Sequence, residues 1–195
     1  MLNQEKQVNS YLLKWYSQNK RDLPWRKLFH NNLPNPYYVF VSEYMLQQTT
    51  VSTVINRFNE FILKWPSLDK LANATEPQIL KFWSGLGYYS RARNLLKAAK
   101  LIKKNFGSKI PNSYDELMTL PGIGDYTAKA IIGIAYNSPV MPTDANIERI
   151  LVRLFAIEKP IIKIKDKLKN LANNFVSQKS SSDLIQSFMD YGSSV

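Results

Sequence analysis

The stretch Leu120–Leu151 reads LPGIGDYTAKAIIGIAYNSPVMPTDANIERIL, and its opening decides how the chain is read. Leu-Pro-Gly-Ile-Gly predicts a tight turn between two helices, over about 113–136. Gly122 and Gly124 permit positive φ angles and a close approach of backbone to a ligand. The helix that follows points free N–H groups and a positive dipole end at the same spot, with Lys129 nearby. The turn therefore predicts a phosphate-binding site; a plain glycine-containing turn is the alternative.

The overall charge indicates what such a site would bind. The chain has 195 residues, with 26 Lys and Arg against 15 Asp and Glu, a net charge of +11. This excess favours a polyanionic partner, nucleic acid first and a membrane surface second. No apolar run approaches the length of a membrane span. An indifferent basic surface is the alternative.

The absence of cysteine excludes several kinds of site. With no cysteine in the sequence, disulfides, thiolate metal sites and cysteine nucleophiles are ruled out, and we expect a cytoplasmic protein. The single histidine, His30, lies in the polar stretch HNNLPNP and is interpreted as a solvated loop residue. We therefore expect no metal site.

The apolar pattern is helical nearly throughout and predicts an all-α fold. A proline-rich loop is expected at 19–36, and 161–164 is the only weak strand candidate. Capping boxes are expected at Thr75–Gln78 and Ser113–Glu116. The expected helices are 9–18, 37–48, 51–64, 75–86, 88–106, 113–119, 125–136, 145–157, 165–176 and 182 onward.

Two carboxylates that are isolated from other charges in the sequence are candidate catalytic groups. Glu43 is the only formally charged residue between Lys27 and Arg57, and its surroundings YYVFVSEYMLQQ are mostly apolar. Poor solvation should raise its pKa and make it a proton donor. Asp144 follows a long uncharged run and begins a predicted helix. An acid paired with an ionised carboxylate is the equipment for cleaving a glycosidic bond. The alternatives are a satisfied buried glutamate and an ordinary N-cap aspartate.

Two segments carry planar and polar side chains of the kind that an enzyme flipping bases uses. Tyr88 follows a glycine break in GLGYYSRAR, and Gln48 follows the predicted Glu43 helix. Such side chains fill the hole left by a flipped base. Trp25 and Arg26 offer a stacking surface and a donor. The alternative is that the tyrosines and Trp25 complete the core and that the glutamines are solvated.

These segments together resemble the adenine-specific DNA glycosylases of the helix–hairpin–helix base-excision repair superfamily, which remove adenine mispaired with 8-oxoguanine. The resemblance covers most of the chain. It is carried by LPWR at 23–26, VSEYMLQQT at 41–49, GLGYYSRARNL at 85–95, LPGIGDYTAKAI at 120–131 and DANIERIL at 144–151.

The resemblance implies a role for each matching residue. Glu43 matches the acid that protonates adenine, and Asp144 matches the carboxylate that stabilises the oxocarbenium-like state. Asn146 and Tyr126 match residues that support this carboxylate and the sugar. Related bifunctional lyases carry a Schiff-base lysine where this chain has Tyr126, which implies a monofunctional enzyme.

The same resemblance implies how DNA is held. The partner is double-stranded DNA with an A:8-oxoguanine or A:G mispair, bound by a monomer. Gln48 and Tyr88 match residues inserted into the duplex. The matching adenine-pocket residues are Trp25, Arg26, Leu46 and Gln186. We expect one catalytic domain, with a lobe of about 24–134 and a lobe of about 1–23 plus 135–195.

The sequence also departs from the family pattern. The loop Lys27–Pro36 is longer than usual, and Ala145 replaces a common glycine. In the family, a segment like FMDYGSSV runs into four cysteines that hold a [4Fe–4S] cluster, followed by a domain that reads 8-oxoguanine. We therefore expect no cofactor in this chain and interpret it as a truncated form of such an enzyme, with a naturally complete clusterless form as the alternative. A non-catalytic DNA-binding remnant and an oxidised-pyrimidine lyase are the rival functions.

Overall fold

The computed structural model describes the backbone of residues 2–195 and all of their side chains except those of Leu2, Asn3 and His30. The interpretation of His30 as a solvated side chain therefore lies outside the described residues. The all-α prediction is confirmed: the described chain contains helices, 3-10 turns and one isolated bridge between Leu28 and Pro34, and no strand. None of the described helices is long and apolar enough to cross a membrane.

The chain divides into two compact units. The middle unit is Leu23–Gly124, and the terminal unit combines the residues up to Asp22 with Asp125–Val195. The boundary falls before the expected division at Ile134 because the helix Asp125–Tyr136 (α8) packs on the last helix. Gly133 of α8 has no side chain there, and a Cβ would collide with Ile185. The turn at Pro121 thus belongs to the middle unit and the helix after it to the terminal unit.

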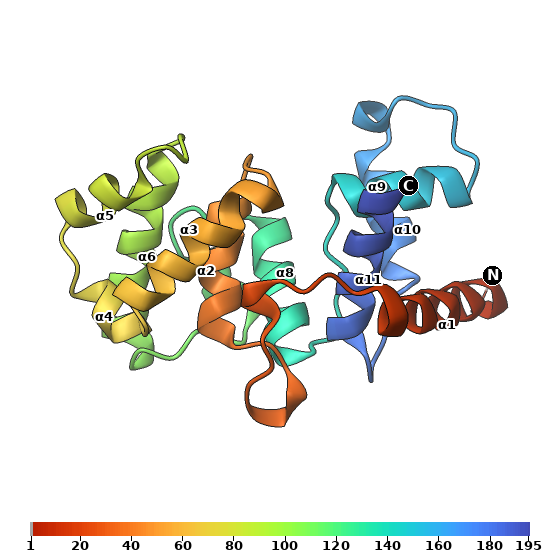
Figure 1. Cartoon of the computed structure of the whole chain (residues 1–195). Coiled ribbons are helices and arrows are strands. Elements are labelled where there is room, and N and C mark those ends of the chain that lie inside the picture. The colour runs from red at the N-terminus through yellow and green to blue at the C-terminus, as the bar shows by residue number, and fades with distance from the viewer. Residues whose placement is uncertain (1) are drawn as a thin grey trace. The chain divides into compact units, whose positions relative to one another are not determined.

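The middle unit is organised around two neighbouring helices, α2 and α6 (Figure 1). α6 contacts α2, α4 and α5, and α2 also contacts α3. Aromatic side chains fill this core, with Phe40, Tyr44 and Trp83 fully buried. The elements are η1 (Pro24–Arg26), η2 (His30–Asn32), α2 (Pro36–Leu46), α3 (Val51–Lys64), α4 (Leu68–Ala72), α5 (Glu76–Trp83), α6 (Ser90–Phe106) and α7 (Tyr114–Met118).

The terminal unit is organised around α11, which contacts α1, α8 and α9. Most of α11 is buried, including its polar residues Gln186 and Asp190. In Figure 1 the N-terminal helix (red) lies beside α11 (dark blue), although they come from opposite ends of the sequence. The elements are α1 (Leu2–Asn19), α8 (Asp125–Tyr136), α9 (Ala145–Leu154), η3 (Ile161–Lys163), α10 (Lys165–Asn173) and α11 (Ser181–Ser194).

Local signals explain which expected elements formed. The capping box at Thr75 is confirmed: Gln78 N donates to Thr75 Oγ1 at 3.4 Å, and Thr75 N donates to Gln78 Oε1 at 2.9 Å. The box expected at Ser113 is wrong, because the Ser113 side chain makes no cap hydrogen bond although the helix begins there. The weak strand candidate at 161–164 is also wrong: it is a 3-10 turn.

One buried ion pair fixes the N-terminal segment to the last helix. Arg21 donates from its backbone N and from Nε to the carboxylate of Asp190, at 3.0 and 2.6 Å. The Asp190 side chain is fully buried, while that of Arg21 is 34% exposed. A buried carboxylate needs such donors, because an unpaired charge inside a protein is costly.

Replacing Asp190→Asn should lower the free energy of unfolding by about 3 kcal/mol, because the amide sets an N–H group against the donors of Arg21. Urea unfolding measures the change. The control is Glu76→Gln, which removes an exposed pair with Arg93 and should cost less than about 1 kcal/mol. Equal small losses in both variants would contradict the role given to the buried pair.

Candidate active site

Glu43 lies on the buried side of α2, in the middle unit. Asn35 caps this helix by accepting from Tyr37 N at 2.9 Å, and Pro36 occupies its first turn. Glu43 is 6% exposed, among fully buried neighbours such as Phe40 and Tyr44. The expectation of a poorly solvated carboxylate is confirmed in its burial. Leu46 closes the same helix and is half-buried.

The turn at Pro121 is tied to the end of α2 by its carbonyl groups. Tyr44 Oη donates to Pro121 O at 2.5 Å, and Gln47 Nε2 donates to Gly122 O at 3.2 Å. Burial raises the pKa of Tyr44 far above its usual range, so its hydroxyl remains a donor. With its carbonyls turned toward α2, the exposed backbone of this hairpin is held in one position relative to Glu43's helix.

The two glycines of this hairpin are not equivalent. Gly122 has φ of 81°, and a Cβ there would lie 2.9 Å from Asn94 Cβ and 3.0 Å from a Tyr44 ring carbon. Gly124 is exposed, has no positive φ, and has open space where a Cβ would stand. The fold therefore requires glycine at position 122. It does not require glycine at position 124, where a close approach of a ligand to the backbone would be the reason for one.

Gln48 and Tyr88 lie on two separate turns of the middle unit, and both adopt left-handed backbone. Their φ angles are 56° and 46°, and both side chains are exposed, Tyr88 by 61%. Such a conformation costs a residue with a side chain about 1–2 kcal/mol. Strained, exposed residues of this kind cluster at functional sites, since surrounding contacts must hold them in place.

Arg91 is a residue of this site that the sequence reasoning missed. Its guanidinium is buried and donates to backbone carbonyls of both turns, Met45 O at 2.7 Å and Leu86 O at 2.9 Å among them. Burial lowers its pKa. The sequence showed two arginines in this segment. Only three-dimensional packing distinguishes buried Arg91 from Arg93, which is exposed and pairs with Glu76.

Trp25 and Arg26 form the short turn η1 at the start of the middle unit. Trp25 is 6% exposed and packs edge-on against Phe58, with ring centroids 5.4 Å apart. This packing favours the core alternative for most of the indole ring. Arg26 is half-buried at the end of the turn.

Asp144 is the N-cap of α9, in the terminal unit. Its Oδ1 accepts from the backbone N of Asn146 at 3.1 Å and of Ile147 at 2.8 Å. Its Oδ2 accepts from Asn146 Nδ2 at 2.9 Å. The N-cap alternative is thus confirmed as geometry. The same bonds fix a half-buried carboxylate in one orientation, with N–H donors that suit an acceptor-only group.

Arg149 sets the orientation of the Asn146 amide, and this link was also missed from sequence. Arg149 donates to Asn146 Oδ1 at 3.1 Å and to Gly192 O. The amide oxygen faces Arg149, so the NH₂ group faces Asp144. Gly192 is necessary for this approach, since a Cβ there would lie 2.5 Å from Asn146 O. Arg149 therefore supports Asp144 through Asn146.

The other predicted residues of the terminal unit lie on α8 and α11. Tyr126 is half-buried in the first turn of α8. Lys129 forms an ion pair with Asp125 at 3.0 Å, so its charge is partly offset. Gln186 is 3% exposed; its Nε2 donates to Ser182 O, and its Oε1 has no hydrogen-bond partner among the described residues.

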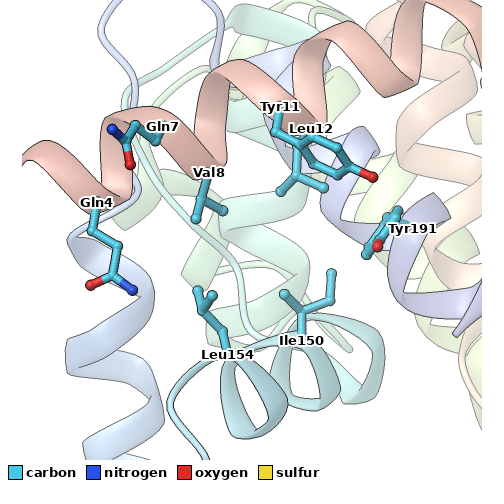
Figure 2. A pocket seen from close by; sticks show the side chains of 8 residues that line it. All are labelled: Gln4, Gln7, Val8, Tyr11, Leu12, Ile150, Leu154 and Tyr191. Atoms are coloured by element: carbon cyan, nitrogen blue, oxygen red, sulfur yellow. The ribbon is translucent and has the colours of Figure 1, made fainter.

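A cavity of about 330 Å³ in the terminal unit carries none of the predicted residues. Figure 2 shows Val8 and Leu12 of α1 facing Ile150 and Leu154 of α9, with Tyr191 of α11 at one end. Its lining is mainly apolar and lacks a carboxylate, so it offers no group for the predicted chemistry.

The described residues do not fit the cluster that the resemblance implies. Such a cluster is held by cysteine thiolates, and the sequence contains no cysteine. No group of three or more His, Asp or Glu side chains in the described chain could hold a metal ion either.

The two glycines of the hairpin give a matched pair of variants. Gly122→Ala should destabilise the fold by about 1–3 kcal/mol, because it meets Asn94 and Tyr44 and strains φ. Gly124→Ala should leave the melting temperature nearly unchanged but weaken DNA binding, if backbone there approaches a phosphate. Calorimetry and fluorescence anisotropy measure the two effects. Full DNA affinity in Gly124→Ala would contradict the phosphate contact.

Comparison with known proteins shows the family to which this sequence belongs. Residues 41–177, which include Glu43 and Asp144, match the model of the HhH-GPD superfamily base excision DNA repair proteins. The chain is 41% identical over 192 residues to an adenine DNA glycosylase of Mus musculus, covering 95% of this chain and 37% of that protein. It is 38% identical over 187 residues to an adenine DNA glycosylase of Buchnera aphidicola subsp. Acyrthosiphon pisum, covering 94% and 52%. The chain thus spans about half or less of the length of these relatives.

Solved structures share the same fold. A thermostable thymine-DNA glycosylase superposes with a TM-score of 0.84 at 25% identity, covering 97% of this chain and 86% of that one. Endonuclease III in a non-covalent complex with DNA superposes with a TM-score of 0.73 at 19% identity, covering 97% of this chain and 84% of that one. At this identity the likeness shows the fold alone. With its helical fold, its hairpin at Pro121 and its match over residues 41–177, the chain belongs to the HhH-GPD superfamily of base excision DNA repair proteins.

Proposed function

We propose that this chain is the catalytic part of a monofunctional adenine DNA glycosylase. It removes adenine mispaired with 8-oxoguanine or guanine by hydrolysis of the N-glycosidic bond. The observation that carries this proposal is the burial of Glu43, the one acidic side chain of α2. Glu43 lies in a chain whose relatives are named adenine DNA glycosylase. The partner is double-stranded DNA, and the protein acts as a monomer.

In the proposed mechanism, Glu43 is the general acid. Protonation of the adenine ring turns a poor leaving group into a good one, and a buried carboxyl group is suited to hold the proton until it is needed. Glu43 lies on a helix rather than a loop. The end of α2 is fixed because Tyr44 and Gln47 donate to the carbonyls of Pro121 and Gly122 and because Arg91 donates to Met45 O. The acid is therefore held on a rigid element.

Asp144 stabilises the cationic sugar that remains after the base departs. Its carboxylate is fixed by three N–H donors from Asn146 and Ile147, so no reorganisation is required when positive charge develops. Water then completes the hydrolysis. We assign to Tyr126 the support of the sugar, and to Trp25, Arg26, Leu46 and Gln186 contacts with the adenine base.

Position 126 favours simple hydrolysis over lyase chemistry. A lyase needs an amine to form a Schiff base with the sugar, and the residue here is tyrosine. Lys129, the nearest lysine along the chain, forms an ion pair with Asp125. An oxidised-pyrimidine lyase would be revealed by borohydride trapping of a covalent protein–DNA adduct.

Single-turnover cleavage of a duplex with adenine opposite 8-oxoguanine tests the proposal. Strand scission should require subsequent alkali, because hydrolysis leaves an abasic site. Glu43→Gln should lower the rate by about 10²–10⁴-fold. The control Glu60→Gln changes an exposed glutamate of α3 and should leave the rate unchanged.

Asp144→Asn separates the two uses of that residue. Asparagine caps a helix about as well as aspartate but loses the hydrogen bond that Asp144 Oδ2 accepts from Asn146 Nδ2, so the free energy of unfolding should fall by no more than about 1–2 kcal/mol while the rate falls by about 10²-fold or more. A different outcome would support a non-catalytic DNA-binding remnant. In that outcome wild type and Glu43→Gln bind the duplex equally well, and neither shows turnover.

Phosphate contacts should make DNA binding steeply salt-dependent. The net charge of +11 favours phosphate contacts. With about four of them, the affinity should fall about 100-fold between about 50 and 200 mM salt. Anisotropy titrations at several salt concentrations measure the slope. A duplex with uncharged methylphosphonate linkages is the control, and a flat response with natural DNA would contradict a basic binding surface.

A further inference from the structure

The two residues proposed to enter the duplex are joined by one guanidinium. Gln48 follows the C-terminal end of α2, and Tyr88 follows the turn after α5. Arg91, in the first turn of α6, is 6% exposed and lies between these two turns. No strand or disulfide links them among the described residues, so the buried side chain is their common support.

Each of the two turns is bound by a different nitrogen of the Arg91 guanidinium. Nη1 donates to Tyr44 O at 3.4 Å, to Met45 O at 2.7 Å and to Gln47 O. The last of these carbonyls directly precedes Gln48. They are also the carbonyls that a helix end leaves without intrahelical partners, at the negative end of the helix dipole. The cation therefore holds the segment that leads into Gln48.

The other nitrogen holds the segment that leads into Tyr88. Nη2 donates to Leu86 O at 2.9 Å and to Gly87 O at 3.2 Å. The guanidinium carbon also lies 5.6 Å from the centroid of the Tyr88 ring and 5.5 Å from that of Trp83. Trp83 Nε1 donates to the same Gly87 O at 3.1 Å. The backbone that leads into Tyr88 and the ring of Tyr88 thus both contact this support.

Arginine is the residue that this geometry requires. Its planar fork presents N–H groups from two nitrogens in fixed directions, whereas a lysine ammonium is a single point of donors on a flexible stem. A lysine would reach one turn and release the other. Gln48 and Tyr88 both have strained left-handed backbone, so a released turn would relax away from its present conformation.

We propose that Arg91 is a positioning residue that holds Gln48 and Tyr88 at a fixed spacing before DNA is bound, so that both enter the duplex together. The assignment rests on the proposed function, because it takes these two residues as the wedges. Preorganisation of this kind removes the ordering cost from the flipping step. Arg91 itself contacts neither base nor sugar in this account.

The test compares Arg91→Lys with wild type on two duplexes. In one, 2-aminopurine replaces the target adenine opposite 8-oxoguanine, and its fluorescence rises when it leaves the stack. Wild type should raise the fluorescence, and Arg91→Lys should raise it at least about 5-fold less at saturating protein. In the other, adenine lies opposite an abasic site. No pairing then has to be broken, so the rate of adenine release by the variant should approach that of wild type.

Arg57→Lys is the matched control. Arg57 also donates to a backbone carbonyl of the turn after α5, Ser84 O at 2.6 Å, and lies over an aromatic ring, that of Phe82. The side-chain hydrogen bonds of Arg57 go to Glu60 and Ser84, not to the carbonyls of Gln47 or Leu86. Arg57→Lys should match wild type on both duplexes.

A background without wedges checks that Arg91 acts through them. In Gln48→Ala/Tyr88→Ala protein, adding Arg91→Lys should change the fluorescence by less than about 2-fold. If Arg91→Lys melts below the assay temperature, Trp83→Phe replaces it. This variant removes one donor to Gly87 O but keeps a ring under the guanidinium, and it should show the same defect in weaker form.

The outcomes separate this inference from the proposed function. Equal 2-aminopurine fluorescence for wild type and Arg91→Lys would overturn the positioning role. An equal loss of the rate of adenine release opposite 8-oxoguanine and opposite the abasic site would do so too, because it would show a general structural effect. If wild type releases adenine neither opposite 8-oxoguanine nor opposite the abasic site, the proposed function fails, while the fluorescence comparison still decides the role of Arg91.

Discussion

The carbonyl groups at the C-terminal end of α2 are the constraint on which the middle unit depends. A helix end leaves its last carbonyls without partners, and inside a protein they must be satisfied. Here a cation from α6 satisfies them, since Arg91 donates to Tyr44 O, Met45 O and Gln47 O. The same helix end donates in return, through Tyr44 and Gln47, to the carbonyls of the hairpin at Pro121 and Gly122. The two turns that carry Gln48 and Tyr88, the hairpin and Glu43 are thereby fixed to one helix.

In the terminal unit the unpaired backbone groups are those at the start of α9, and an N-cap residue satisfies them. Asp144 satisfies the first N–H groups of α9, as an ordinary capping aspartate does. Structural and catalytic uses of such a residue are compatible, because the bonds that cap the helix also fix the carboxylate. Arg149 and Gly192 extend this support by turning the Asn146 amide toward Asp144. In both units an arginine that the sequence pattern did not single out organises the residue proposed to act.

The sequence predicted elements well where local chemistry defines them. α3 and α8 have the bounds expected from periodicity and their flanking residues, and the cap at Thr75 formed as expected. The helix Leu68–Ala72 was missed because five residues are too few to show a helical period. Ser113 had the spacing of a capping box but forms no such bond, since spacing does not fix a rotamer.

The sequence predicted the burial of Glu43 but not the contacts that join the candidate residues. The isolation of Glu43 in an apolar segment correctly predicted its burial, because an uncharged neighbourhood in sequence reflected a core helix. The ion pair of Lys129 with Asp125 and the packing of Trp25 on Phe58 depend on tertiary contacts and side-chain rotamers. The burial of Arg91 depends on carbonyls from residues 44–47, distant in sequence, and no local pattern could reveal it.

Mass spectrometry of the products from an oligonucleotide duplex with adenine opposite 8-oxoguanine tests the central claim most directly. If Glu43 and Asp144 hydrolyse the N-glycosidic bond, the products are free adenine and a full-length strand that has exchanged the base for a hydroxyl group. An unchanged strand after prolonged incubation, or a strand broken at the target sugar without alkali, would contradict the account.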